Sequence, residues 1–183
     1  MRKKPLIVLD RDGVINYDSD AFIKTPEEWV ALPNSLEAIA SLNEAGYTVT
    51  VASNQSGLAR GLLDQQTLIN IHNKMLDEAK IVGAHIDTIV YCPHHPDDHC
   101  DCRKPLPGLL RQLMDNYSCT PEDLLVVGDS LRDLEAAWSI GAKAVLVRTG
   151  NGINTEKKLP DDQRKNVFND LSDVAHYLAK GTL

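Results

Sequence analysis

Two acidic clusters in the sequence each follow a short apolar run. Asp10 and Asp12 flank Arg11 in the first cluster, and Asp129 precedes Asp133 by about one helical turn in the second. Side chains alternate faces along extended backbone, so we expect Asp10 and Asp12 to point one way and Arg11 another. Convergent carboxylates form a hard-oxygen site that suits Mg²⁺. Such a site would let an anionic nucleophile approach a phosphate, which is the requirement of phosphoryl transfer.

Gly13 follows the first acidic pair and allows the chain to turn sharply beyond it. The alternative is an exposed acidic turn with no chemistry, because a short Asp-x-Asp motif often occurs by chance. The apolar run before each of the two clusters favours the phosphoryl-transfer interpretation, since both clusters would then lie at strand ends.

A second group of residues, rich in sulfur and nitrogen, lies in the segment 92–108. Cys92 and His94 form one close pair, and Cys100 and Cys102 form another. Three thiolates and an imidazole are the donors that a tetrahedral zinc site prefers, and four protein ligands indicate a structural ion. The alternative is a chance cluster of free thiols.

Three neighbouring residues have less clear roles. His95 and His99 compete with the favoured His94 for the nitrogen position, and Cys119 is expected to pack as a small hydrophobic residue.

Arg103 and Lys104 follow the second cysteine pair, so a zinc-ordered loop would present two cations. Arg103 could hold a second phosphate or sugar oxygens bidentately; the alternative is a solvated surface arginine.

Alternating apolar runs and amphipathic segments predict the elements that position these residues. Strands are expected at 6–9, 48–52, 86–91, 124–127 and 144–147, and helices at 35–45, 64–82, 109–117, 131–140 and 171–178. This alternation predicts a single Rossmann-like α/β domain over residues 1–183, with three layers, a central parallel sheet and no large cap domain. Ligands bind outside the carboxyl ends of the strands in such sheets, where the acidic clusters would lie.

The composition limits the possible partners. The chain has 183 residues, 43% of them hydrophobic, and a formal net charge of −7. An acidic chain of this kind is a poor candidate for binding nucleic acid, and the apolar runs are too short to span a membrane. We therefore expect a cytoplasmic protein that acts on a small phosphorylated metabolite. Without a cap-domain insertion, we expect a monomer with a small open site.

Four short motifs follow one another along the chain in a recognisable order. Residues 10–16 (Asp-Arg-Asp-Gly-Val-Ile-Asn), Ser53, Lys104 and Gly128-Asp129 with Asp133 resemble the four motifs of the haloacid dehalogenase (HAD) superfamily of phosphatases. The resemblance implies that Asp10 is the nucleophile, that Asp12 is the general acid and base, and that Ser53 and Lys104 stabilise the phosphoryl group.

The same resemblance implies a catalytic Mg²⁺. Asp10, Asp129 and the backbone carbonyl of Asp12 would hold it. For Asp133 three roles stay open: a direct ligand, a ligand through water, or a clamp for Lys104.

Longer motifs narrow the resemblance. The segments Cys-Pro-His-His-Pro (92–96), Cys-Asp-Cys-Arg-Lys-Pro (100–105), 53–61 and Val-Arg-Thr-Gly (147–150) resemble the D-glycero-D-manno-heptose 1,7-bisphosphate 7-phosphatase family. That family removes a phosphate during nucleotide-activated heptose synthesis for bacterial surface glycans such as lipopolysaccharide. The implied substrate contacts are Arg11, Gly13, Asp18, Asp20, Asn54, Gln55, Ser56 and Arg103.

One departure from this family concerns the metal loop. Many heptose phosphatases carry a longer insertion between His94 and Cys100, whereas the related histidinol-phosphate phosphatases have the short spacing found in this chain. The segments 57–61 and 148–150 favour the sugar substrate. Two further classes are a non-catalytic zinc-stabilised binding module, which would not need the acidic residues, and a polynucleotide 3′-phosphatase, which the acidic charge disfavours.

Overall fold

A six-stranded parallel sheet forms the centre of the protein. The computed structural model describes residues 5–181. The strands lie in the order β3-β2-β1-β4-β5-β6, and every neighbouring pair is parallel. Their bounds are β1 Leu6–Leu9, β2 Thr48–Asn54, β3 Thr88–Cys92, β4 Leu124–Gly128, β5 Lys143–Val147 and β6 Val167–Phe168.

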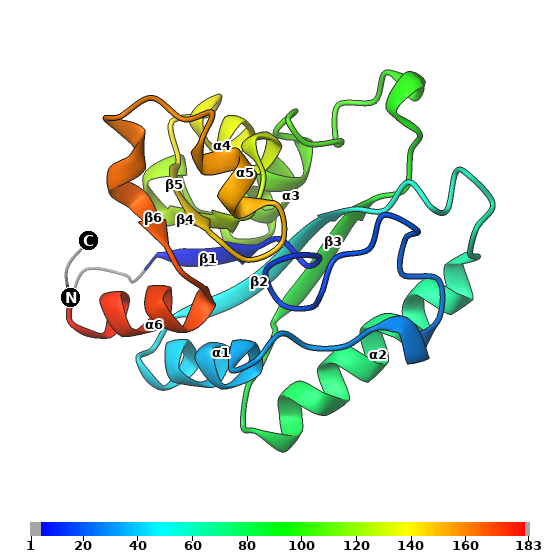
Figure 1. The fold of residues 1–183 in the computed structure, drawn as a ribbon, viewed down its shortest axis with the longest axis horizontal. Coiled ribbons are helices and arrows are strands. Elements are labelled where there is room, and N and C mark those ends of the chain that lie inside the picture. Colours follow the sequence, from blue (N-terminus) through cyan, green and yellow to red (C-terminus); the bar gives the residue numbers. More distant parts are fainter. Residues whose placement is uncertain (1–4, 182–183) are drawn as a thin grey trace.

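Helices cover both faces of this sheet (Figure 1). On one face lie α1 Ser35–Glu44, α2 Gln65–Ile81 and α6 Leu171–Ala179; on the other lie α3 Gly108–Tyr117, α4 Leu131–Trp138 and α5 Gly152–Glu156. Short 3-10 helices span Pro26–Glu28, Pro96–Asp98, Pro121–Asp123 and Gln163–Asn166. The result is a three-layer α/β domain.

The first strand shows how the two hydrophobic cores arise. Ile7 and Leu9 belong to the core beneath α1, α2 and α6, whereas Leu6 and Val8 belong to the core beneath α3 and α4. All four residues are buried, as expected for a strand with helices on both sides. An uninterrupted apolar run is therefore required at this place.

Local signals account for the bounds of α2. The Asp64 carboxylate accepts a hydrogen bond of 2.7 Å from the Thr67 N–H and caps the first turn. The chain leaves the helix through Gly83, whose φ of +78° is a conformation that favours glycine.

The fold class and the five strands predicted from the sequence are confirmed, with small shifts in bounds. β3 begins at Thr88 instead of residue 86. The prediction did not include α5 or β6, because five and two residues are too few to show a period. β6 lies at the edge of the sheet, where pairing on one side suffices.

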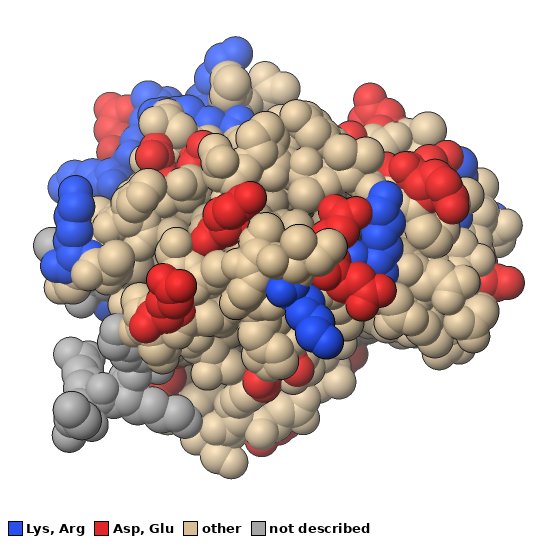
Figure 2. Space-filling view, turned by 90° about the horizontal axis from the view of Figure 1, so that it is seen from below, with Lys and Arg blue, Asp and Glu red and all other residues tan. Residues whose placement is uncertain are grey.

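The surface carries charges of both signs. On the face shown in Figure 2, Lys and Arg side chains lie interspersed with Asp and Glu side chains. Within residues 5–181, each helix is too short or too polar to serve as a membrane span.

The core under α1 provides a test of the fold. Replacing Ile39, which is fully buried, by alanine should lower the free energy of unfolding by about 2–5 kcal/mol, because a cavity remains. Ile81→Ala, at an isoleucine with 82% exposure, should change it by less than about 0.5 kcal/mol. Urea unfolding followed by circular dichroism measures both, and equal losses would contradict this packing.

Candidate active site

The sheet topology brings the two acidic clusters together. β1 and β4 are neighbours, and the order of the strands reverses between them, which is where open α/β sheets bind ligands. Asp10 follows β1, and its N–H donates to the Val127 carbonyl 2.9 Å away. Asp129 follows β4, so both carboxylates lie at the predicted carboxyl edge of the sheet.

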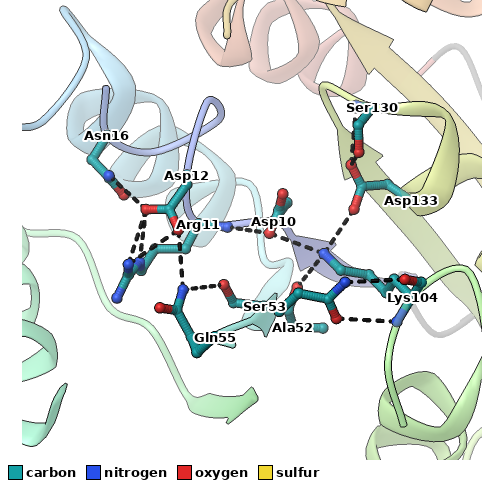
Figure 3. Close-up of polar contacts among 11 residues, drawn as sticks. Asp10, Arg11, Asp12, Asn16, Ala52, Ser53, Gln55, Lys104, Ser130 and Asp133 are labelled. Carbon is teal, nitrogen blue, oxygen red and sulfur yellow. Dashed lines mark hydrogen bonds and ion pairs between the residues drawn. The ribbon is translucent and has the colours of Figure 1, made fainter. Parts of the chain in front are cut away.

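A buried lysine occupies the centre of this edge (Figure 3). Lys104 Nζ lies 2.9 Å from Asp10 Oδ1 and 2.7 Å from Asp133 Oδ1, and it donates to the Ala52 carbonyl at 2.7 Å. Burial alone would lower the pKa of Lys104, but the two carboxylates outweigh it and raise that pKa. Lys104 is therefore a fixed cation between the carboxyl ends of β1 and β2 and the first turn of α4.

Asp133 lies against this lysine. Its Oδ1 faces Lys104, and its Oδ2 accepts hydrogen bonds from Ser130 N–H at 3.1 Å and Ser130 Oγ at 2.6 Å. The carboxylate packs against Gly128, where an added Cβ would overlap Asp133. Of the three roles left open by the sequence, this geometry favours the clamp.

Three carboxylates, that of Asp133 included, form a site that fits a divalent cation. Oxygens of Asp10, Asp129 and Asp133 lie within 4.8 Å of one another. Burial raises the pKa of Asp10 to about 6 in spite of Lys104, and burial together with repulsion from Asp10 raises the pKa of Asp129 to about 8. Surplus negative charge at buried oxygen donors is the condition that Mg²⁺ relieves.

Two glycines shape the surroundings of Asp129. Gly13, with φ +82°, and Gly150, with φ +56°, approach its carboxylate so closely that a Cβ at either position would overlap Oδ2. The next N–H, of Asn151, donates to the same oxygen at 2.8 Å. Gly13 thus permits both the sharp turn and the close approach.

Asp12 lies beside Asp10 and is held by several donors. Arg11 Nε and Asn16 Nδ2 lie 3.0 Å and 2.9 Å from Oδ1, and Gln55 Nε2 lies 3.0 Å from Oδ2. Asp10 and Asp12 both line one cavity, as the alternation of side chains predicts. Arg11 and Gly13, predicted as substrate contacts, do not line that cavity, and Arg11 is completely buried.

The end of β2 connects the strand edge to the loop of Lys104. Ser53 Oγ accepts a hydrogen bond of 2.8 Å from Gln55 Nε2. The Asn54 side chain donates to the Lys104 carbonyl and accepts from the Lys104 N–H, both at 3.0 Å. Asn54, Gln55 and Ser56 all line the cavity.

The cavity has a volume of about 330 Å³ and carries charges of both signs. Its acidic residues are Asp10, Asp12, Asp18 and Asp20, and its basic residues are Arg60, Arg103, Lys104 and Arg132. The sequence interpretation omitted Arg60, Arg132 and Asn151 as contacts. Arg132 directly precedes Asp133, and Arg60 follows Ser53 by seven residues, so proximity to the motifs was the available signal.

The predicted zinc ligands also meet. Cys92 Sγ lies 3.7 Å from Cys100 Sγ and 3.6 Å from His94 Nδ1, which lies 3.2 Å from Cys102 Sγ. In a tetrahedral site with Zn–S bonds of about 2.3 Å, two sulfurs lie about 3.8 Å apart. All four donor atoms lie within 4.8 Å of one another, so the donor set and its spacing fit zinc.

The competing residues lie outside this cluster. His95 caps the helix Pro96–Asp98, and its Nδ1 accepts from the Asp97 N–H at 3.4 Å. His99 follows that helix with φ +50°. Cys119 packs against the hydrophobic core beneath α3 and α4, in agreement with the packing role expected for it.

Comparisons with known proteins agree with this geometry. A family model described as "HAD-hyrolase-like" matches residues 101–174. D-glycero-beta-D-manno-heptose-1,7-bisphosphate 7-phosphatase from Pseudomonas putida is 52% identical over 94% of this chain and 98% of its own length. The enzyme of the same name from Bordetella bronchiseptica is 53% identical over 94% of this chain and 97% of its own.

Solved structures give the same result. The crystal structure of the D,D-heptose 1,7-bisphosphate phosphatase from B. bronchiseptica, complexed with magnesium and phosphate, superposes with a TM-score of 0.92 at 52% identity, covering 97% of this chain and 99% of that one. The enzyme from Burkholderia thailandensis superposes with a TM-score of 0.74 at 44% identity, covering 96% and 98%. The chain belongs to the D-glycero-beta-D-manno-heptose-1,7-bisphosphate 7-phosphatase family of HAD-like hydrolases.

Proposed function

We propose that this protein is a Mg²⁺-dependent phosphatase that removes the 7-phosphate of D-glycero-beta-D-manno-heptose 1,7-bisphosphate. The observation that carries the proposal is that Asp10 and Lys104 form an ion pair in the wall of a charged cavity, with the Asp129 carboxylate close to that of Asp10. The relatives described above bear the name of this activity, and they match nearly the whole chain. We therefore favour the heptose substrate over histidinol phosphate, in spite of the short spacing between His94 and Cys100.

Asp10 would act as the nucleophile. One of its oxygens bonds to phosphorus while the bond from phosphorus to the sugar oxygen breaks, which gives an aspartyl-phosphate. Lys104, 2.9 Å from Asp10 Oδ1, would offset the negative charge shared by the carboxylate and the phosphoryl group. The Ser53 hydroxyl and nearby N–H groups would hold phosphoryl oxygens.

Asp12 would act as the general acid in the first step and as the general base in the second. It lines the same cavity as Asp10, so its carboxyl group can donate a proton to the departing sugar oxygen. The resulting carboxylate would then take a proton from the water that attacks the aspartyl-phosphate. This second step returns both aspartates to their starting state.

The metal ions would have separate tasks. Asp10, Asp129 and the Asp12 carbonyl would hold Mg²⁺, which, when bound, neutralises phosphoryl charge as the nucleophile approaches. Cys92, His94, Cys100 and Cys102 would hold a structural zinc that orders the segment before Lys104.

The arginines of the cavity suit a substrate with two phosphates. Arg103 Nη1 is buried and has no hydrogen-bond partner among residues 5–181. Burial and the nearby charges of Arg132 and Arg60 lower the pKa of Arg103. A second phosphate that binds the Arg103 guanidinium would relieve the repulsion among the three cations. Asp18 and Asp20 would accept hydrogen bonds from sugar hydroxyls.

Removal of either aspartate function should stop turnover. Asp10→Asn should eliminate phosphate release because the amide is not nucleophilic, and Asp12→Asn should lower kcat by about 10²–10⁴-fold because the proton donor is lost. Asp77→Asn, at an exposed aspartate of α2, is the control and should retain activity. Substantial turnover by folded Asp10→Asn protein would refute the covalent route.

The zinc proposal predicts the metal content of the purified protein. We expect about one zinc per chain after dialysis, because all four ligands are protein groups. Cys102→Ser should lower this content, whereas Cys119→Ser should leave it unchanged, since Cys119 lies outside the cluster. Emission spectroscopy measures the metal. Wild-type protein with no zinc and with titratable thiols would contradict the proposal.

A rate comparison tests the substrate. The 7-phosphate of the β-heptose 1,7-bisphosphate should be released with a higher kcat/KM than phosphate from the α anomer, fructose 1,6-bisphosphate or histidinol phosphate. The charged residues of the cavity suit a sugar with two phosphates better than histidinol phosphate, which has one. The β-heptose is expected above the other two sugars because the relatives are named for that substrate. A clear preference for histidinol phosphate would reverse the assignment.

A further inference from the structure

Arg11 is a charged side chain that the proposed mechanism does not use. It is completely buried, although it stands between two residues that line the cavity. A buried guanidinium is costly unless its charge is paired and its donors are satisfied. Its partners therefore show what its position achieves.

The Arg11 guanidinium donates two hydrogen bonds to the Asp12 carboxylate (Figure 3). Arg11 Nε donates to Oδ1 at 3.0 Å, and Nη2 donates to Oδ2 at 3.1 Å. Such a fork fixes the plane of a carboxylate as well as its position. Asn16 and Gln55 each add one hydrogen bond, at 2.9 Å and 3.0 Å, so donors from three places in the chain hold this group.

His72 on α2 supports the far side of the same guanidinium. Its Nε2 lies 3.4 Å from Arg11 Nη1, and its ring lies 5.9 Å from that of Tyr91. Burial, with the charge of Arg11, lowers the pKa of His72 to about 4. The neutral imidazole can thus accept a hydrogen bond from Arg11 Nη1. Because His72 is part of α2, the helix holds this acceptor in place beside the guanidinium.

We propose that Arg11, held by His72, is a positioning residue that sets the orientation of the Asp12 carboxyl group toward the leaving oxygen of the phosphoester. The inference rests on the proposed phosphatase activity and adds a specific task to two residues outside the cavity. A carboxyl group can rotate about its terminal torsion, so an Asp12 without the fork would spend less time aimed at the leaving oxygen.

The alternative is an ion pair that only stabilises the fold. The leaving group of the substrate distinguishes the positioning role from the structural role. A p-nitrophenolate departs readily without a proton, whereas an alkoxide requires one. The value of kcat/KM reports formation of the aspartyl-phosphate, the step in which Asp12 is the acid. The experiment is therefore to measure kcat/KM with Mg²⁺ for p-nitrophenyl phosphate, phenyl phosphate and the β-heptose 1,7-bisphosphate, which is the sugar phosphate of the comparison.

Arg11→Lys keeps the charge and loses the fork. We expect its kcat/KM for the sugar phosphate to fall by about 10²-fold and that for p-nitrophenyl phosphate to change little, with phenyl phosphate between them. Arg148→Lys is the matched control, because Arg148 makes the same bidentate contact with Glu156 at 2.7 Å and 2.8 Å but does not line the cavity. It should leave the dependence on the leaving group unchanged.

His72→Leu tests the support even if Arg11→Lys does not fold. It should cause a smaller loss of the same selective kind, whereas Met75→Leu, at another buried residue of α2, should not. Equal losses for all three substrates, or no loss, would overturn the positioning role while wild-type activity upholds the proposed function. Wild-type protein that hydrolyses none of these esters would overturn both.

Discussion

The site depends on one buried cation among carboxylates. Lys104 is nearly inaccessible to solvent, and its ammonium group is stable there because Asp10 and Asp133 lie within 3 Å. Those two acids and Asp129 place three negative charges around one positive charge. Burial, together with repulsion among these acids, raises the pKa values of Asp10 and Asp129, and a bound divalent cation would relieve both effects. Loss of Lys104 would leave Asp10 and Asp133 without the cation that both contact.

The position of that cation depends in turn on a loop with little regular structure. The segment between β3 and α3 contains only the 3-10 helix Pro96–Asp98. It is tied to the sheet by the two Asn54 hydrogen bonds to the Lys104 backbone and by the Gln55 N–H, which donates to the Cys92 carbonyl at 2.8 Å. The Cys-His cluster closes the same segment on itself. The zinc proposed for this cluster would hold Lys104 against the entropy of a long loop without taking part in the chemistry.

The sequence predicted the layers and the acidic centre because both depend on strong local patterns. Uninterrupted apolar runs fix strands buried on both faces, and a residue that ends such a strand must lie at the sheet edge. It did not predict that Arg60, Arg132 and Asn151 reach the cavity, because their approach depends on how loops and helix ends pack. The same holds for Arg11: alternation predicts that its side chain turns away, but His72 comes from α2, 61 residues further along the chain.

The two arginine environments show why residue type alone does not assign a role. Arg11 and Arg103 both lie next to residues of the site, and both looked like substrate contacts in the sequence. Arg11 has its donors directed at Asp12 and His72, so little capacity is left for a ligand. Arg103 lines the cavity with a donor that no described residue accepts. A buried arginine whose donors are paired with protein groups can orient its neighbour. One that has an unpaired donor and lies beside other cations is suited to bind an anion.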